Sequence, residues 1–220
     1  MNEKLNRVLE KWKQKIKNDF PAKSFVSDGI INEKYWQNCQ PKILIIMKEV
    51  NSEKDDFTSL SQLVNDRIGH KSQLWKYIAW HNIGRVTNGL LEVHHNMQII
   101  PIKDAEKDRQ EVLKNIAVMN IKKTPGGDSS KDKEILKHAE NYSELIKEEI
   151  KVINPDIIIL GGTYKYLKEI LQLEKQSYRI HKDPSNRVYI NAYHPSARIG
   201  KGKYYSEVVQ SYYNYLINQT

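Results

Sequence analysis

Apolar residues recur at helical spacing through the first part of the chain, at Leu5, Val8, Leu9, Trp12 and Ile16. Pro21 follows, and proline ends a helix because it has no amide hydrogen to donate. The pattern therefore predicts an amphipathic helix over residues 1–20, with its apolar side packed on the rest of the protein.

Four short apolar runs follow, each with the length and composition of a strand that is buried on both faces. They lie within residues 43–47, 116–121, 154–162 and 187–193. Helical patterns separate or follow them, over residues 70–93 (with a break expected at Gly84 and Gly89), 104–115, 131–153, 163–172 and 204–217. Alternating strands and helices predict a single domain over residues 1–220. We expect an α/β fold, a three-layer α/β/α sandwich around a central, mainly parallel four-stranded sheet.

Polar segments stand directly after each predicted strand. They are KEVNS (48–52), NIKKTPGG (120–127), GGTYK (161–165) and HPSAR (194–198). In a parallel sheet the carboxyl ends of the strands meet at one edge, and ligands bind beyond that edge. The sequence therefore predicts that these segments form one functional site.

Composition narrows the class of partner. Thirty-five Lys and Arg against 27 Asp and Glu give a formal charge of +8, which favours DNA or another polyanion, although a solvated surface of mixed charge gives the same total. Cys39 is the only cysteine, so we expect no internal disulfide and no metal cluster. The sequence shows no signal region and no membrane-spanning apolar run, so we expect a cytoplasmic monomer.

Three strand-end side chains suggest a specific chemistry. Glu49, Asn120 and His194 are a carboxylate, a carboxamide and an imidazole that follow different strands. Such a set suits scission of the bond between a sugar and a nucleobase. The imidazole can hydrogen-bond the departing base, the carboxylate can orient water, and the amide offers one donor and one acceptor to a base edge.

These residues and their surroundings resemble the uracil-DNA glycosylase superfamily over roughly residues 41–217. KILIIMKEVN is similar to the first-strand motif of that family, VMNIKKTPGGD to the second-strand segment of its thermophile-type branch, and YHPSAR to its histidine loop. The resemblance implies excision of a flipped base without a cofactor. It assigns water activation to Glu49, base recognition to Asn120 and stabilisation of the leaving base to His194. The iron–sulfur cysteines of the thermophile-type branch are absent here.

The resemblance also implies further contacts. Pro195 would stiffen the histidine loop, and the DNA-contacting residues would be Lys122, Lys123, Ser196, Arg198, Lys201 and Lys203. Phe57 is placed to stack on the base, and Tyr193, Trp75 and Trp80 are further aromatic candidates. Val50 and Asn51 stand where some branches have a tyrosine that excludes 5-substituted pyrimidines.

Other interpretations of these residues stay open at this point. Glu49 could be a solvated carboxylate opposite Lys48, and Asn120 could cap its own loop. The segment at 161–165 is better explained as a tight turn than as a phosphate cradle, and the histidines at 94–95 as surface residues than as metal ligands.

Three functions remain under consideration. The first is a glycosylase for uracil or a modified pyrimidine. The second is a glycosylase for bulky modified bases of viral DNA, acting in antiviral defence. The third is a nucleic-acid-binding module without catalysis.

Overall fold

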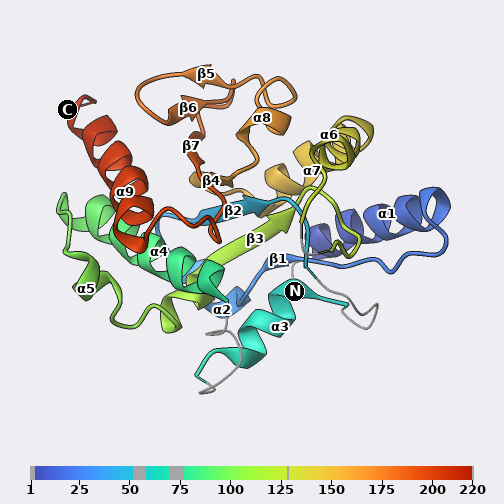
Figure 1. Ribbon diagram of the computed structural model, residues 1–220, viewed down its shortest axis with the longest axis horizontal. Helices are drawn as coiled ribbons and strands as arrows, with labels where there is room; N and C mark the ends of the chain where they lie inside the picture. Colours follow the sequence, from blue (N-terminus) through green and yellow to red (C-terminus); the bar gives the residue numbers. More distant parts are fainter. Residues whose placement is uncertain (1–2, 52–57, 70–76, 128, 220) are drawn as a thin grey trace.

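The computed structural model describes residues 3–51, 58–69, 77–127 and 129–219 (Figure 1). Within this part of the chain the strands form one seven-stranded sheet in the order β1-β3-β2-β4-β7-β6-β5. The strands are β1 Gly29–Ile30, β2 Ile43–Met47, β3 Ile116–Asn120, β4 Ile157–Gly161, β5 Glu174–Lys175, β6 Ile180–Lys182 and β7 Val188–Ala192.

The four predicted strands are β2, β3, β4 and β7, and they pair with one another in parallel. The prediction of a four-stranded sheet was incomplete. β1 adds to β3, and β6 and β5 extend the sheet beyond β7, all in antiparallel pairing. These additional strands have two or three residues each, which is too short for a two-residue hydrophobic alternation to be recognised.

Helices cover both faces of this sheet. They are α1 Glu3–Asp19, α2 Glu33–Asn38, α3 Leu60–Arg67, α4 Ile78–Asn96, α5 Ile102–Ala105, the 3₁₀ helix η2 Glu111–Asn115, α6 Asp132–Asn141, α7 Ser143–Ile153, α8 Tyr164–Leu167 and α9 Lys201–Ile217. None of the described helices is both long and apolar enough to cross a membrane.

Two predicted helices are interrupted in the structure. The helix predicted over 104–115 is wrong: α5 ends at Ala105, η2 begins at Glu111, and Asp108 between them has a left-handed backbone with φ of 52°. The helix predicted over 131–153 is divided at Tyr142 into α6 and α7. The helix predicted over 163–172 is shorter, because α8 ends at Leu167.

The expected break at Gly84 and Gly89 is also wrong, because α4 runs through both residues. These glycines allow close packing instead. A Cβ at Gly84 would lie 2.2 Å from the carbonyl oxygen of Arg109, and one at Gly89 would lie 2.7 Å from the ring of Tyr205 in α9. Both glycines therefore let neighbouring segments approach the backbone of α4.

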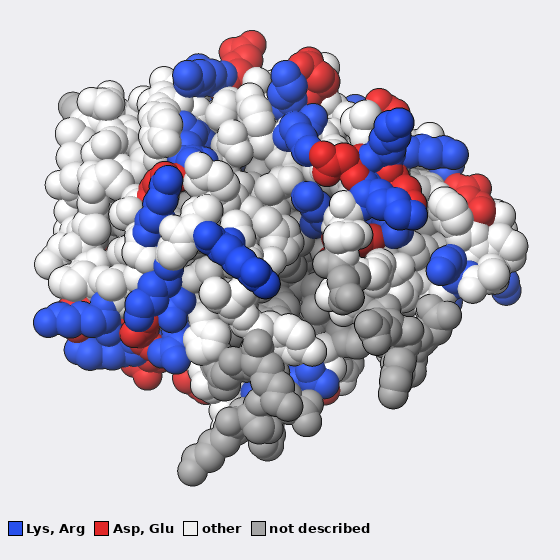
Figure 2. All heavy atoms as spheres, viewed as in Figure 1, with Lys and Arg blue, Asp and Glu red and all other residues white. Residues whose placement is uncertain are grey.

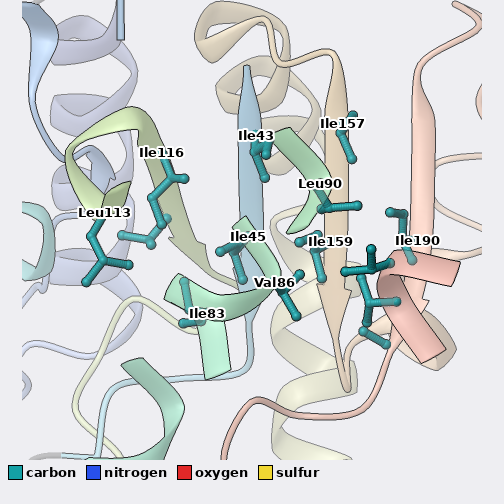
Figure 3. Packing of buried hydrophobic residues seen from close by; sticks show 14 of the residues in the cluster. Ile43, Ile45, Ile83, Val86, Leu90, Leu113, Ile116, Ile157, Ile159 and Ile190 are labelled. Carbon is teal, nitrogen blue, oxygen red and sulfur yellow. The ribbon is translucent and has the colours of Figure 1, made fainter. Parts of the chain in front are cut away.

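The core consists of buried apolar side chains on both sides of the sheet. In β2, Ile43 and Ile45 face α4 and α9, whereas Leu44 and Ile46 face α1 and α7. Figure 3 shows Ile43 and Ile45 on the same side of the sheet as Val86 and Leu90 of α4. Because β2, β3 and β4 are buried along their whole length, their apolar residues are continuous in sequence, as the apolar runs suggested.

Candidate functional site

The predicted polar segments do follow strands that end at the same edge of the sheet. Met47 pairs with Asn120, and Gly161 pairs with Ala192, so β3, β2, β4 and β7 end side by side. The outer two of these strands are separated by three strand spacings, or about 14 Å at about 4.8 Å each. Asn120 and His194 can therefore act on one ligand only if it spans the ends of β2 and β4.

Glu49 follows β2, and its carboxylate is held inside the structure. Its side chain is 4% exposed, and Lys122 donates a hydrogen bond to Oε2 at 2.5 Å. Gly126 covers it closely, since a Cβ there would lie 2.2 Å from the carboxyl carbon. The alternative of a solvated carboxylate opposite Lys48 is wrong, because Lys48 pairs with Asp132 at 3.7 Å.

Asn120 ends β3 and is 2% exposed. Its backbone N–H donates to Oδ2 of Asp28 at 2.6 Å, which holds the end of the strand in place. Its side-chain carboxamide is different: among the described residues neither the nitrogen nor the oxygen has a hydrogen-bond partner. The structure therefore gives no support to a capping role. A buried polar group without a partner costs about 1–3 kcal/mol, and such a cost in a native protein calls for an explanation.

His194 lies in the loop after β7 with one ring nitrogen already engaged. Nδ1 accepts a hydrogen bond from the backbone N–H of Ser196 at 3.2 Å and lies 2.7 Å from the hydroxyl of the same residue. The neutral ring therefore carries its proton on Nε2, which leaves an N–H donor. Burial lowers the pKa of His194 below its ordinary value, and the positive charge of Lys48 lowers it further. The imidazole is thus kept neutral at pH 7.

Two glycines after β4 make room for this histidine loop. A Cβ at Gly161 would lie 3.0 Å from the ring of Pro195, and one at Gly162 would lie 3.2 Å from the backbone nitrogen of His194. Gly162 also has φ of 71°, a conformation that favours glycine. The predicted tight turn at 161–165 is confirmed, and the close approach of the histidine loop explains why both residues are glycines.

The histidine loop is also tied to α4 by residues that sequence reasoning missed. Asn82 is buried and donates a hydrogen bond to the carbonyl oxygen of Pro195 at 2.7 Å. Arg85 donates to the amide oxygen of Asn82 at 2.9 Å and to Glu106 at 2.9 Å. Asn82 and Arg85 lie on the apolar side of α4, close to the buried Val86. Their polar side chains on an otherwise apolar helix face are the sequence signal by which both residues could have been predicted.

The prediction that Lys123 contacts DNA is wrong, because this residue is fully buried. Its side chain is 0% exposed and is paired with Asp28 and, at 3.0 Å, with Glu149. Its amino group also lies 5.3 Å from the ring centre of Trp12. Burial alone would lower the pKa of Lys123, but the carboxylates of Asp28 and Glu149 outweigh it and hold the pKa above its ordinary value. Lys123 is therefore part of the protein interior.

Four of the other predicted DNA-contacting residues lie on the surface. Ser196 and Arg198 are exposed in the loop between β7 and α9, and Lys201 and Lys203 are exposed in the first turn of α9. Lys201 pairs with Glu106 at 2.8 Å, Lys203 lies 3.9 Å from Glu207, and Lys122 is largely buried beside Glu49. Figure 2 shows lysine and arginine side chains beside acidic ones over α6, and others among uncharged residues nearer the middle of this face.

The remaining candidates are placed as follows. Val50 is half-buried against the core on the α4 side, and the exposed Asn51 forms a bridge with Gly126. Trp80 is a core residue. Phe57 and Trp75 lie outside the described residues. Tyr193 is 39% exposed.

Two pockets lie away from the strand-end residues. A pocket of about 560 Å³, lined in part by Cys39, His95 and Asn115, lies where β2 and β3 begin, and a smaller one lies at the β5–β6 hairpin. In the described ranges no group of three or more His, Cys, Asp and Glu side chains could hold a metal ion. The rings of His94 and His95 meet edge to face, and Nδ1 of His94 lies 3.1 Å from the hydroxyl of Tyr212.

Comparison with models of known protein families finds no match for this chain, and a search of curated proteins finds none either. The fold and the arrangement of the strand-end side chains therefore carry the functional argument.

Proposed function

We propose that this protein is a monofunctional DNA glycosylase that extrudes a pyrimidine and hydrolyses its N-glycosidic bond. The observation that carries the proposal is the buried carboxamide of Asn120, whose donor and acceptor are both unpaired among the described residues. A pyrimidine edge presents a matching acceptor and donor, so a bound base would satisfy both groups at once. Sequence resemblance to the uracil-DNA glycosylase superfamily supports the same assignment.

His194 has the state that the leaving base requires. When the glycosidic bond breaks, its electron pair goes to the base, which becomes an anion. Nε2–H can donate a hydrogen bond to that anion, while Nδ1 stays fixed by Ser196. The lowered pKa keeps the imidazole of His194 neutral, and in this state Nε2–H is available as the hydrogen-bond donor.

Glu49 supplies negative charge on the sugar side in this mechanism. The departing base leaves a cationic sugar, and a nearby carboxylate favours that cation. Water then adds to the anomeric carbon and passes its proton to the carboxylate of Glu49. Lys122 lies 2.5 Å from the carboxylate and offsets part of its charge. The ion pair fixes the carboxylate, and binding of DNA would redistribute the contacts of Lys122 toward phosphate.

Excision measured on a panel of DNA strands tests the proposal. Strands with a single uracil, hydroxymethylated pyrimidine or glucosylated pyrimidine are incubated with the protein and heated in alkali, which breaks the chain at abasic sites. Asn120→Ala and His194→Ala should each lower the rate by about 100-fold or more, as loss of one such contact does in other enzymes. His95→Ala, at an exposed histidine outside the site, is the matched control. Wild-type rates in both site variants would overturn the assignment.

The same panel separates the two ranges of substrate. Val50, which is half-buried, and Asn51, which is exposed, have no aromatic ring that could block the 5-position of the pyrimidine. This favours acceptance of modified bases, as an antiviral defence enzyme would require. Strict preference for uracil would exclude that role.

A binding module without catalysis is the second candidate function, and one observation favours it. The carboxylate of Glu49 is buried and already paired with Lys122. If that pair persists on DNA, water activation is weak. Salt-dependent DNA binding with no abasic product from any strand would support this alternative.

A further inference from the structure

A rigid aromatic surface lies beside the histidine loop. β6 runs antiparallel to β7, with Ile180 opposite Ile190, so the residues before β6 lie beside the last residues of β7. Figure 1 shows β6 and β5 beyond β7, at one lateral edge of the sheet. Tyr178 in that hairpin is 65% exposed, and Tyr193, directly before His194, is 39% exposed.

Arg179 connects the two rings. Its guanidinium carbon lies 5.2 Å from the ring centre of Tyr178 and 4.7 Å from that of Tyr193. The guanidinium is itself fixed, because it donates to the carbonyl oxygen of Asn191 at 2.8 Å and pairs with Glu207. A cation held over both rings restricts the tyrosine side chains, whereas a solvated tyrosine on a hairpin would not be restricted in this way.

The backbone of Arg179 gives a second reason to assign a role to this surface. Its φ is 62°, in the left-handed region that few residues other than glycine and asparagine adopt. In this conformation the carbonyl oxygen of Arg179 accepts a hydrogen bond from the backbone N–H of Asn191 in β7 at 2.8 Å. Such conformations persist where surrounding contacts hold them, and they cluster at binding and active sites.

We propose that Tyr178 and Tyr193, held by Arg179, form a stacking platform for an unpaired nucleobase of a DNA strand. The proposal deepens the glycosylase assignment and rests on it for the identity of the strand. Rigid, exposed rings next to the candidate site offer their faces to a base, and stacking on tyrosine tolerates any base. Arg198 is exposed in the loop after His194, Lys201 and Lys203 are exposed in the first turn of α9, and all three would supply positive charge for the phosphates.

The geometry of DNA favours an unpaired base over an intact duplex as the ligand of the two rings. In a duplex the faces of each base are covered by its neighbours, so a protein ring can stack only where a base is unstacked. The platform is therefore expected to bind single-stranded DNA, or the strand beside an extruded nucleotide. Arg179 is largely buried and paired with Glu207, so the rings, and not its charge, make the contact.

Two probes of equal charge separate base stacking from phosphate attraction. One is a fluorescent thymidine strand of about 15 nucleotides, a length that matches the site size of typical single-strand-binding proteins. The other is the same backbone with every base removed. Wild-type protein should bind the thymidine strand more tightly than the base-free strand. Tyr178→Ala should lower affinity for the thymidine strand by about 5- to 100-fold, as loss of one stacked base does, and should leave the base-free strand unaffected.

The control variant is Tyr35→Ala. Tyr35 is also exposed and lies 5.2 Å from the amino group of Lys114, but it belongs to α2, outside the candidate site. Its removal should change neither affinity, and Tyr178→Phe should retain binding. Equal binding of the two strands by the wild type, no binding of either, or wild-type binding by Tyr178→Ala would overturn the platform.

Failure of the platform and failure of the glycosylase assignment give different results. Asn120→Ala should lose excision but bind the thymidine strand normally, because Asn120 lies at the other side of the strand ends. Tyr178-dependent binding without excision of any base would leave the platform in place and remove the enzyme assignment. Excision with no effect of Tyr178→Ala on binding would do the reverse.

Discussion

Replacement of Lys123 by methionine should strongly destabilise the protein. Lys123 is the cation of a fully buried cluster with Asp28 and Glu149. Methionine keeps most of the side-chain volume and removes the charge, so two carboxyl groups remain without a partner cation. Removing one member of a buried ion pair typically costs about 3–5 kcal/mol, because the remaining charge stays uncompensated.

The charge states within the cluster keep the loss within that range. Burial raises the pKa of Glu149 to about 8, although Lys123 opposes the shift. Glu149 therefore holds a proton at pH 7, and the carboxylate of Asp28 is the group that loses its cation. Asp28 still accepts the backbone N–H of Asn120, which offsets part of the cost. A loss of about 3–5 kcal/mol is a large share of the roughly 5–15 kcal/mol by which domains are stable.

Equilibrium unfolding in urea, followed by far-UV circular dichroism, measures this effect. Lys11→Met is the matched control, since Lys11 pairs with Glu148 at 2.5 Å on the surface, and such pairs contribute about 0–1 kcal/mol. A triple variant, Lys123→Met with Asp28→Asn and Glu149→Gln, removes all three ionisable groups and should recover much of the loss. The reasoning is refuted if Lys123→Met costs no more than Lys11→Met.

The other predictions concern pH and the histidine loop. The pKa of Glu149 is raised to about 8 from an ordinary 4.5, so the folded state holds this proton more tightly than the unfolded state, and the stabilisation is lost as pH rises through 8. Urea titration of the wild type should therefore show a fall in the free energy of unfolding between pH 5 and 8, and Glu149→Gln should flatten that fall. An unchanged slope in the variant would contradict the prediction. Because the pKa of His194 is lowered, single-turnover excision should be constant above pH 6.5 and decline only below it; a decline that begins near pH 7.5 would show a different titrating group. Asn82→Ala removes the donor to Pro195, so we expect excision to fall by about 10-fold or more with little change in binding of base-free DNA; equal loss in both measurements would indicate general unfolding.

The strands that support the site were predictable because each is buried on both faces. Five consecutive buried residues, as in Ile43–Met47, leave a continuous apolar run that few other structures produce. The short antiparallel strands carry no such signal. The helix predicted over 104–115 failed for a tertiary reason: the segment bends so that Arg109 packs its backbone on Gly84, which overrides a helical pattern of moderate strength.

The residues of the candidate site were predictable to the extent that they follow strands. A residue that ends a parallel strand lies at a known edge of the sheet, whatever the rest of the chain does. The support for those residues comes from other elements and was not predictable in the same way. Asn82 reaches Pro195 across 113 positions, and this contact depends on how α4 lies against the sheet.

Lys122 and Lys123 show where sequence reasoning reaches its limit. They are neighbours in a basic loop, and composition alone assigns both to a DNA-contacting surface. In the structure Lys122 turns to Glu49 and Lys123 turns into the core toward Asp28. The direction of each side chain depends on the bend that follows β3 and on the acidic residues that pack against it, and composition carries no signal for either.

That inward direction connects the core to the candidate site. The carboxylate of Asp28 binds Lys123 through one oxygen and the backbone N–H of Asn120 through the other. The buried ion pairs therefore hold the strand end that presents the unpaired carboxamide. A change that loosens Lys123 should shift Asn120 even in molecules that remain folded, so the excision rate per folded molecule should fall in Lys123→Met but not in Lys11→Met. This comparison separates a core that only stabilises the fold from one that also positions the base-recognition residue.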